Sequence, residues 1–333
     1  MHYKILVILP NWLGDAIMAT PAIELLAKEY PNAKFTFVGS YVSIEALKHH
    51  PLCERAIVDE TKKASSRLLA TYKLAKELGQ FHLAITFRNQ LHSSLLLRLT
   101  GTVVCLAKKS WHSMFLLSHT PTISNKQHLV KQYAELAMID VDNKEYEIQN
   151  LKLYIEAQKF IKPMLGINAG ATYGSAKRWY PERFAELGAA FSDEYDIIIF
   201  GGPNEVEMAQ EIEDNLKNRK VTNYINLAGK TTISELCSNI AGCSIFVTND
   251  SGPMHVAAAY QVPTVAIFGP TKYKETSQWQ NEKGTIVRHE MDCSPCMKRE
   301  CPLGHHECMK NITAFEVINA VRALNIESSK KRT

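Results

Sequence analysis

The chain has 333 residues, of which 46% are hydrophobic and 22% charged, and its formal net charge is +4. This length is more than one hydrophobic core comfortably organises, so it predicts two domains that can each bury a core. The mild charge gives no reason to expect nucleic acid as a partner. No apolar run reaches the roughly 18 residues of a membrane span, and the N-terminus lacks a secretory profile, so we expect a cytoplasmic protein.

In the first half of the chain, apolar runs alternate with helical patterns. A strand, a loop and a helix are expected over 4–30. The further strands expected are 35–40, 55–60, 82–87 and 102–107, and the helices are 43–50, 65–79 and 92–99. This alternation predicts parallel βαβ units and a doubly wound sheet.

Residues 108–128 are irregular and are expected to form a long loop or short helices beside a functional site, because long unpatterned insertions in compact domains are often functional. A helix near 127–140 and a strand near 147–155 are expected to close the first domain. The domains are then 1–157 and 158–333.

The second half repeats the alternation. The strands expected there are 164–170, 196–202, 222–229, 244–250 and 264–269, and the helices are 181–194, 205–216, 232–243, 254–261 and 313–325. The sequence therefore predicts a second doubly wound α/β domain. The last helix is expected to pack back onto the first domain.

The stretch 248–271 indicates a phosphate site. A β-branched run ends in Asn249-Asp250-Ser251-Gly252, where a helix begins. Backbone N–H groups and the helix dipole at such a start favour an anion such as a diphosphate. An ordinary helix capped by Ser251 is the alternative.

A second loop, at the first strand, carries Gly14-Asp15 at the start of a helix. An acidic residue there is commonly a helix cap. The loop follows the carboxyl end of a strand, however, where open α/β sheets bind their ligands.

Three segments together resemble the heptosyltransferases of glycosyltransferase family 9: LGDAIMATPAI (13–23), GATYGSAKRWYPERFAELG (170–188) and NDSGPMHVAAAYQVPTVAIFGPT (249–271). The resemblance covers nearly the whole chain in the same order. It implies the GT-B fold, with two Rossmann-like domains facing across a cleft. It also implies inverting transfer of heptose from ADP-L-glycero-D-manno-heptose to the inner core of lipopolysaccharide or lipooligosaccharide.

The resemblance also suggests which heptose is added and where. The cysteine-bearing run 293–308 is similar to that of members that add the second heptose to the first. Transfer of the first heptose to Kdo-lipid A is the alternative. The acceptor lies at the inner face of the cytoplasmic membrane, where the protein would act as a peripheral protein.

The family match assigns roles to particular residues. Asp15 matches the proposed catalytic base, which takes the proton of the acceptor hydroxyl. The residues that match donor-binding positions are Thr172, Ser175, Lys177, Glu205, Asp250, Ser251, Gly252 and His255. Of these, Lys177 is expected to contact the diphosphate, Glu205 the ribose and Asp250 a sugar hydroxyl. Solvated charges at helix starts are the alternative for Lys177 and Glu205.

The acceptor candidates are Arg88 and Arg98, with Lys108 and Lys109 after them, and segment 88–101 resembles the acceptor-side helix of the family. Arginine forks suit the carboxylates and phosphates of the inner core. The chain departs from the family pattern here, since Arg-Asn-Gln-Leu-His stands where Asn-Ser-Phe-Arg or Asn-Ser-Phe-Lys is usual.

A cluster of four cysteines follows the last expected strand. Cys293, Cys296, Cys301 and Cys308 provide enough soft ligands for a structural zinc ion, although their spacing is not that of a common zinc finger. The alternative is a compact loop of reduced thiols, which is what we expect in a reducing compartment. The family resemblance implies that transfer needs no metal.

Two other classes of function can be compared with these motifs. An NAD-dependent oxidoreductase would also contain Rossmann-like domains, but no G-x-G-x-x-G follows the first strand. A zinc-dependent nucleic-acid module could use the cysteines, but the basic residues are expected to be dispersed. Neither class accounts for both Asp15 and the 248–271 stretch.

Overall fold

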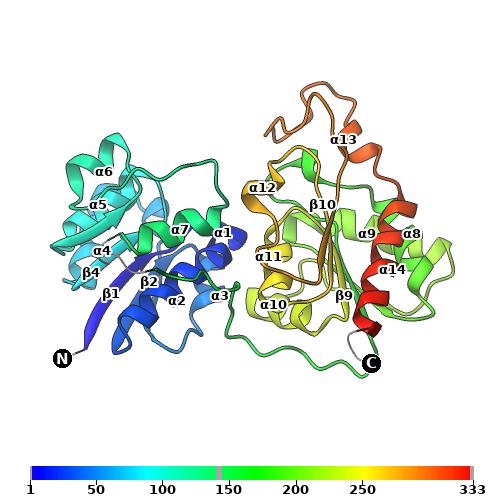
Figure 1. Cartoon of the computed structure of the whole chain (residues 1–333), viewed down its shortest axis with the longest axis horizontal. Coiled ribbons are helices and arrows are strands. Elements are labelled where there is room, and N and C mark those ends of the chain that lie inside the picture. Colours follow the sequence, from blue (N-terminus) through cyan, green and yellow to red (C-terminus); the bar gives the residue numbers. More distant parts are fainter. Residues whose placement is uncertain (1, 140–144, 331–333) are drawn as a thin grey trace. The chain divides into compact units, whose positions relative to one another are not determined.

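The computed structural model describes residues 2–139 and 145–330, with side chains described up to Leu324. The chain divides into two compact units, Met1–Tyr154 and Ile155–Thr333 (Figure 1). The boundary predicted from the sequence, 157/158, lies a few residues further along.

The first unit is a parallel α/β unit, as the alternating pattern predicts. Its strands are β1 (Tyr3–Ile8), β2 (Ala33–Gly39), β3 (Cys53–Val58), β4 (Leu83–Thr86) and β5 (Val104–Ala107). Its helices are α1 (Leu13–Met18), α2 (Thr20–Glu29), α3 (Tyr41–Leu47), α4 (Arg67–Leu78), α5 (Leu91–Leu99), α6 (Trp111–Leu116) and α7 (Leu129–Ala137). The sheet order is β3-β2-β1-β4-β5 with every pair parallel, which is the doubly wound arrangement.

Helices cover both faces of this sheet. On one face, Ala75 and Leu78 of α4 and Leu96 and Leu97 of α5 share a core with Leu6 of β1. The helices α1, α2, α3 and α7 pack against one another in the pairs α1–α3, α1–α7 and α2–α7. Right-handed crossovers place α1 to α3 on the opposite face from α4 and α5.

Short polar side chains begin several of these helices. Ser40 Oγ accepts a hydrogen bond from the Ser43 amide at the start of α3, and Ser66 Oγ accepts one from Leu69 at the start of α4. These caps satisfy donors that an open helix end leaves without partners. The caps fix where each helix begins. The cap at Ser40 directly follows β2, so the loop between that strand and its helix is short.

The end of the first unit differs from the prediction. Residues 145–154 are extended but form no strand, so the strand expected near 147–155 is wrong. Leu151 and Leu153 are buried in strand-like alternation. The backbone bonds to a helix instead of a sheet, because the Lys152 amide donates to Thr20 Oγ1 of α2 at 3.0 Å. The irregular region 108–128 contains one short helix, α6.

The second unit repeats the architecture with one strand more. Its strands are β6 (Met164–Asn168), β7 (Asp196–Phe200), β8 (Tyr224–Asn226), β9 (Ile245–Asn249), β10 (Thr264–Ile267) and β11 (Gly284–Val287). Its helices are α8 (Pro181–Phe191), α9 (Val206–Asn218), α10 (Ile233–Gly242), α11 (Gly252–Ala259), α12 (Tyr273–Thr276), α13 (Glu307–Lys310) and α14 (Ala314–Lys330). The sheet order β11-β10-β9-β6-β7-β8 is again doubly wound, with all pairs parallel.

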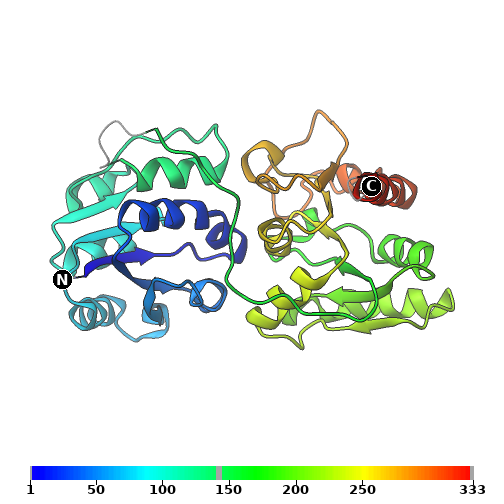
Figure 2. The same cartoon turned by 60° about the horizontal axis from the view of Figure 1, so that its bottom comes forward.

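The C-terminal helix packs differently from the expectation. α14, drawn in red in Figures 1 and 2, packs against α8, β10 and β11 of its own unit. Val317 and Val321 are fully buried in the same core as Phe184 of α8 and Val265 of β10. The buried stripe of this helix therefore completes the second core, which replaces the expected packing onto the first domain.

Candidate active site

The donor-side residues come together at the carboxyl ends of β6 and β9. These two strands are neighbours, with Asn168 in register with Thr248. After β6 the chain winds toward β7, whereas after β9 it winds toward β10, so the strand order reverses between them. Open α/β sheets bind ligands at this kind of switch point.

Lys177 and Asp250 form a buried ion pair at this point. Lys177 Nζ lies 2.6 Å from Asp250 Oδ2, and the same oxygen accepts a hydrogen bond from Thr271 Oγ1 at 2.6 Å. Asp250 is only 4% exposed. The Lys177 ammonium also lies 4.9 Å from the centre of the Tyr173 ring. The structure thus brings two predicted donor residues into direct contact.

Ser251 is not a helix cap, although it stands at the N-cap position of α11. Within the described residues, no side chain caps this helix start. The Ser251 hydroxyl instead lies 3.1 Å from Asn168 Nδ2, which also donates to Thr248 Oγ1 at 3.1 Å. The amide at Gly252 and the helix dipole therefore remain available to an anion.

Glu205 lies beside the same strand end. Its carboxylate accepts a hydrogen bond from the Gly202 amide at 2.7 Å. A Cβ atom placed on Gly170 would lie 2.0 Å from Glu205 Oε2, so only glycine leaves room for this carboxylate. The β7 turn and the β6 loop therefore hold Glu205 at the carboxyl edge of the sheet.

The remaining donor candidates differ in accessibility. Thr172 and Ser175 are exposed on the loop after β6. His255 is 3% exposed and lies in the first half of α11. Only the first two can contact a ligand without a side chain moving.

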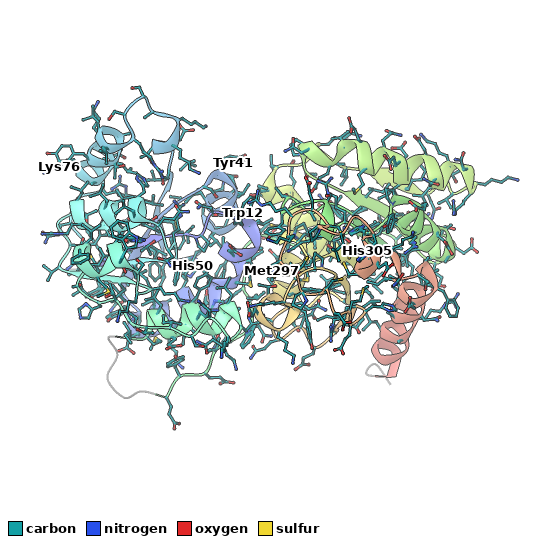
Figure 3. The ribbon with its side chains drawn as sticks, turned by 90° about the horizontal axis from the view of Figure 1, so that it is seen from above. Trp12, Tyr41, His50, Lys76, Met297 and His305 are labelled. Atoms are coloured by element: carbon teal, nitrogen blue, oxygen red, sulfur yellow. The ribbon has the colours of Figure 1, made fainter. Side chains whose placement is uncertain are left out.

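The loop that bears Lys177 is supported by the cysteine-bearing segment. The Arg299 carbonyl accepts a hydrogen bond from the Ala176 amide at 3.0 Å, and His306 Nε2 lies 2.9 Å from the Ala176 carbonyl. Tyr173 donates to the carbonyl of Met297 at 2.8 Å. Figure 3 labels Met297 on this segment. Sequence reasoning missed this support, because the contacts are mostly to backbone atoms that no motif reveals.

The four clustered cysteines line one pocket together with His305 and His306. Backbone N–H groups, first that of His306, lower the pKa of the Cys301 thiol, whereas burial raises the pKa of Cys308 to about 11. Among the described residues, no group of three or more His, Cys, Asp or Glu side chains is arranged to hold a metal ion. All eight cysteines of the chain are free thiols. The zinc alternative stays untested.

Asp15 lies in the first turn of α1, just after β1. It is half-buried and close to Tyr133 of α7, whose pKa is raised first by burial and then by the Asp15 charge. Tyr133 is therefore a neutral neighbour of this carboxylate. The exposed side chain of Trp12 stands at the N-cap and makes no capping hydrogen bond.

Arg88 follows β4 and forms a buried ion pair with Asp59, which follows β3. Arg88 Nη1 lies 3.2 Å from Asp59 Oδ2, and Arg88 Nε donates to the Leu9 carbonyl at the end of β1. Burial lowers the pKa of Arg88, although Asp59 opposes this change. Arg88 Nη2 and Arg67 Nε are both buried and have no hydrogen-bond partner among the described residues.

His92 adds a third nitrogen-bearing group to this cluster. Its pKa is lowered first by burial and then by the Arg67 charge. Arg88 and His92 thus lie beside the Asp59 carboxylate at the carboxyl edge of the first sheet, and the charge of Arg67 acts on both of them. Sequence reasoning did not single out Asp59, Arg67 or His92. One signal could have found Asp59, because it directly follows a strand as Asp250 does.

Arg98 does not join this cluster. It is exposed in the last turn of α5, two turns beyond His92. Its charge acts on Cys105, which lies in the first half of β5, away from the strand ends. The structure therefore does not bring Arg88 and Arg98 together.

Comparison with known proteins agrees with this architecture. The family model described as glycosyltransferase family 9 (heptosyltransferase) matches residues 71–307. The structure of E. coli ADP-heptose lps heptosyltransferase II superposes with a TM-score of 0.82 at 26% identity and covers 98% of this chain and 99% of that chain. No helix in the described part of the chain is long and apolar enough to cross a bilayer.

Two relatives match over almost their whole length. Lipooligosaccharide heptosyltransferase 2 of Campylobacter jejuni is 39% identical over 96% of this chain and 98% of its own. Lipopolysaccharide heptosyltransferase 2 of Escherichia coli is 28% identical over 97% of this chain and 99% of its own. These matches favour neither an oxidoreductase nor a nucleic-acid module. With its two doubly wound units and the GT-B fold of these neighbours, the chain belongs to glycosyltransferase family 9, the heptosyltransferases.

Proposed function

We propose that the chain transfers a heptose from ADP-L-glycero-D-manno-heptose to the inner core of lipooligosaccharide or lipopolysaccharide, and that it adds the second heptose to the first. The two relatives described above are named heptosyltransferase 2, which supports this choice over transfer to Kdo-lipid A. Transfer from an ADP-sugar needs a group that stabilises the negative charge of the departing diphosphate and a base that accepts the proton of the acceptor hydroxyl.

The Lys177–Asp250 pair beside the uncapped start of α11 is the observation that carries the proposal. A cation, a hydroxyl at Thr271 and a helix N-terminus meet at the switch point of the second sheet. Together they suit a diphosphate that gains negative charge as the anomeric C–O bond breaks. Glu205, held beside Gly170, is in place to accept hydrogen bonds from the ribose hydroxyls.

Asp15 of the first unit is the proposed base. As the acceptor oxygen attacks the anomeric carbon, its proton passes to the Asp15 carboxylate and ADP leaves from the opposite face of the sugar. This single displacement inverts the anomeric centre. The phenol of Tyr133 beside Asp15 is neutral and adds no second negative charge there. Asp15 is therefore the group of this pair that can accept the proton.

The Arg67–Arg88 cluster is the proposed acceptor contact. Both guanidinium groups hold a buried N–H group without a partner, and such groups favour a carboxylate or phosphate. Inner-core sugars carry both. We therefore assign the acceptor side to Arg67 and Arg88 and leave out Arg98. Because this acceptor is anchored in the cytoplasmic membrane, the protein works at the inner membrane face as a peripheral protein.

We also propose that transfer requires no metal ion, because Lys177 and the α11 start already supply positive charge for the diphosphate. Transfer should then continue at the same rate in the presence of EDTA. A chelator-sensitive rate that added Mg²⁺ or Zn²⁺ restores would contradict this. Whether zinc occupies the cysteine pocket is a separate question, which elemental analysis of purified protein answers.

The test of the main proposal uses purified protein, ADP-heptose and two truncated acceptors. One acceptor ends in Kdo and the other carries a single heptose on Kdo. Mass spectrometry should show one added heptose on the second acceptor only. Addition to the first acceptor alone would favour the first-heptose reaction, and addition to neither would contradict heptose transfer. NAD should not stabilise the protein in a thermal-shift comparison with ADP.

A further inference from the structure

The basic residues of the chain are not dispersed. Residues 61–131 contain 11 Lys and Arg residues and one acidic residue, Glu77, so this segment has a formal charge of +10 in a chain of +4. The segment spans α4, α5 and α6. Such a concentration of one sign attracts anionic surfaces.

The same three helices expose large apolar side chains. The exposed apolar residues of these helices are Leu68, Leu69 and Tyr72 of α4, Leu91 of α5, and Trp111, Met114 and Phe115 of α6. α5 packs against both α4 and α6, and Figure 1 shows the three helices gathered on one side of the first unit. We call this surface, with its exposed residues Lys62, Lys63, Lys73, Lys76 and Lys109, the α4–α6 face.

The helix α6 exposes its apolar side chains and buries its polar ones, which is the reverse of an ordinary surface helix. Trp111 is 70% exposed and Phe115 83%, whereas His112 and Ser113 are buried. His112 Nδ1 lies 3.2 Å from Ser94 Oγ of α5, so the polar side of α6 packs inward. Exposed large apolar side chains gathered on one short helix are typical of an interaction site.

On α4 the apolar and basic residues share one stripe. Leu68, Tyr72 and Lys76 are spaced four residues apart and are all exposed. The Lys76 ammonium lies 5.5 Å from the centre of the Tyr72 ring, and Figure 3 shows Lys76 on the outside of this helix. A long lysine stem covers apolar surface while its charge stays at the polar boundary.

We propose that the α4–α6 face docks on an anionic lipid bilayer, with Trp111 and Phe115 entering the headgroup region and the lysines contacting anionic headgroups. A protein partner is less suitable, because lysine is depleted in protein–protein interfaces. A nucleic acid is also less suitable, because its phosphates make no favourable contact with Leu68, Leu91 or Phe115. Lysines beside Trp, Phe and Leu are typical of surfaces that lie in the membrane interface. This inference rests on the proposed function, since its acceptor is anchored in such a membrane.

The test measures binding of the full chain to vesicles, with neither donor nor acceptor present, so its outcome is independent of heptose transfer. Wild type should co-sediment with phosphatidylethanolamine–phosphatidylglycerol vesicles and not with pure phosphatidylcholine. Trp111→Ser/Phe115→Ser should bind the anionic vesicles at least about ten-fold more weakly. The matched control is Ile161→Ser/Phe315→Ser, which removes equally exposed apolar groups from the second unit and should bind like wild type.

Charge is tested in the same assay. Lys73→Gln/Lys76→Gln should weaken binding by about ten-fold or more, since each lysine near an anionic surface contributes on the order of 1 kcal/mol. Lys220→Gln/Lys283→Gln loses the same charge from exposed positions of the second unit and should bind like wild type. Equal losses in both pairs would mean attraction by net charge alone, which contradicts a docking face.

Tryptophan fluorescence identifies the inserted residue. Vesicles should shift the emission of wild type to the blue, and Trp111→Phe should abolish the shift while it preserves binding. Trp12→Phe removes another exposed tryptophan and should leave the shift intact. Three results would overturn the proposal. They are a blue shift that is lost in Trp12→Phe instead, a wild-type protein that does not bind anionic vesicles, and vesicle binding that an RNA oligonucleotide competes away.

Discussion

The ammonium group of Lys177 lies 2.6 Å from the carboxylate of Asp250, and both side chains are nearly buried. The pair joins the loop after β6 to the turn after β9, so it links the two strand ends that form the candidate donor site. A diphosphate that reaches Lys177 must share this cation with Asp250. Experiments must therefore separate the proposed binding role of Lys177 from its structural role in this ion pair.

Lys177→Ala should weaken ADP binding by roughly 10- to 100-fold, because a charge-assisted contact to the diphosphate contributes about 1.5–3 kcal/mol. AMP should lose less affinity, since it lacks the second phosphate. Calorimetry with the two nucleotides gives the comparison. If ADP and AMP lose affinity equally, the change has damaged packing. The phosphate contact must then be sought at Ser251 or at Arg178, whose buried Nε has no hydrogen-bond partner among the described residues.

The same substitution should lower the free energy of unfolding by about 3 kcal/mol, because it leaves Asp250 buried without its cation. Lys177→Ala/Asp250→Asn removes that carboxylate charge as well and should recover part of the loss. Denaturant unfolding of both variants measures the difference. A double variant that is no more stable than the single one would show that the ion pair is not the cause.

Asp15→Asn should retain ADP binding and the folded state and lose transfer activity by about 100-fold or more, as removal of a general base does. Asparagine keeps the shape of the side chain and its place in the first turn of α1, so stability should change by less than about 1 kcal/mol. Turnover is measured with saturating donor. Near-normal turnover would reduce Asp15 to a helix-start residue.

Arg88→Gln should raise the KM for the acceptor by about ten-fold or more, whereas Arg98→Gln should change it by less than about two-fold. Both variants lose one charge from the same region, but only Arg88 belongs to the cluster with Arg67 and Asp59. ADP affinity serves as the folding control, since it belongs to the other unit. Equal effects of the two variants would contradict the proposed acceptor contact.

His306→Ala should weaken ADP binding by about ten-fold, because it removes a side chain that bonds to the backbone of Ala176, next to Lys177. His305→Ala is the matched control. His305 lies in the same pocket, but its Nδ1 accepts a local hydrogen bond from the Glu307 amide. Calorimetry with ADP compares the two. Identical affinities would separate the cysteine-bearing segment from the donor site.

Acid should weaken the first unit through Asp59. Burial alone would raise the pKa of this carboxyl, but hydrogen bonds from Thr61 and the charges of Arg88 and His92 hold its pKa below the ordinary value. A carboxyl with a depressed pKa stabilises the fold above its unfolded pKa and loses that contribution as pH falls through the folded value. The difference in unfolding free energy between wild type and Asp59→Asn should therefore be constant above about pH 5 and shrink below about pH 4. A difference that grows on acidification would contradict this.

The periodic patterns predicted the architecture because doubly wound sheets bury their strands as continuous apolar runs. The runs around Ile5, Ile198 and Val247 became strands at the expected places. The segment with Leu151 and Leu153 shows the limit of this reasoning. Both residues are buried, but nothing local says whether such a segment bonds to a sheet or, as here, to the side of α2.

The candidate site was likewise predictable only in part. The turns at Asp15 and Asp250 could be placed at strand ends from the sequence, because polar residues after a buried strand lie at one edge of the sheet. The pairing of Lys177 with Asp250 could not be predicted, since it joins residues far apart in the chain. The separation of Arg98 from Arg88 could not be predicted either, because similarity of segments does not show which turn of a helix carries each side chain. The basic excess of 61–131 was visible in the sequence but was hidden by the near-neutral total.

The contacts of Ala176 with Arg299 and His306 also have a consequence for how the protein is made. The ribosome releases residue 306 long after residue 176, which lies 130 positions earlier. The loop that bears Lys177 therefore acquires its supports only after 130 further residues have been synthesised. Domains fold as units, N-terminal first, so the first unit, with its basic helices, can form while the nascent chain still lacks these supports. A growing chain can thus present the proposed bilayer-docking face before the candidate donor site is complete.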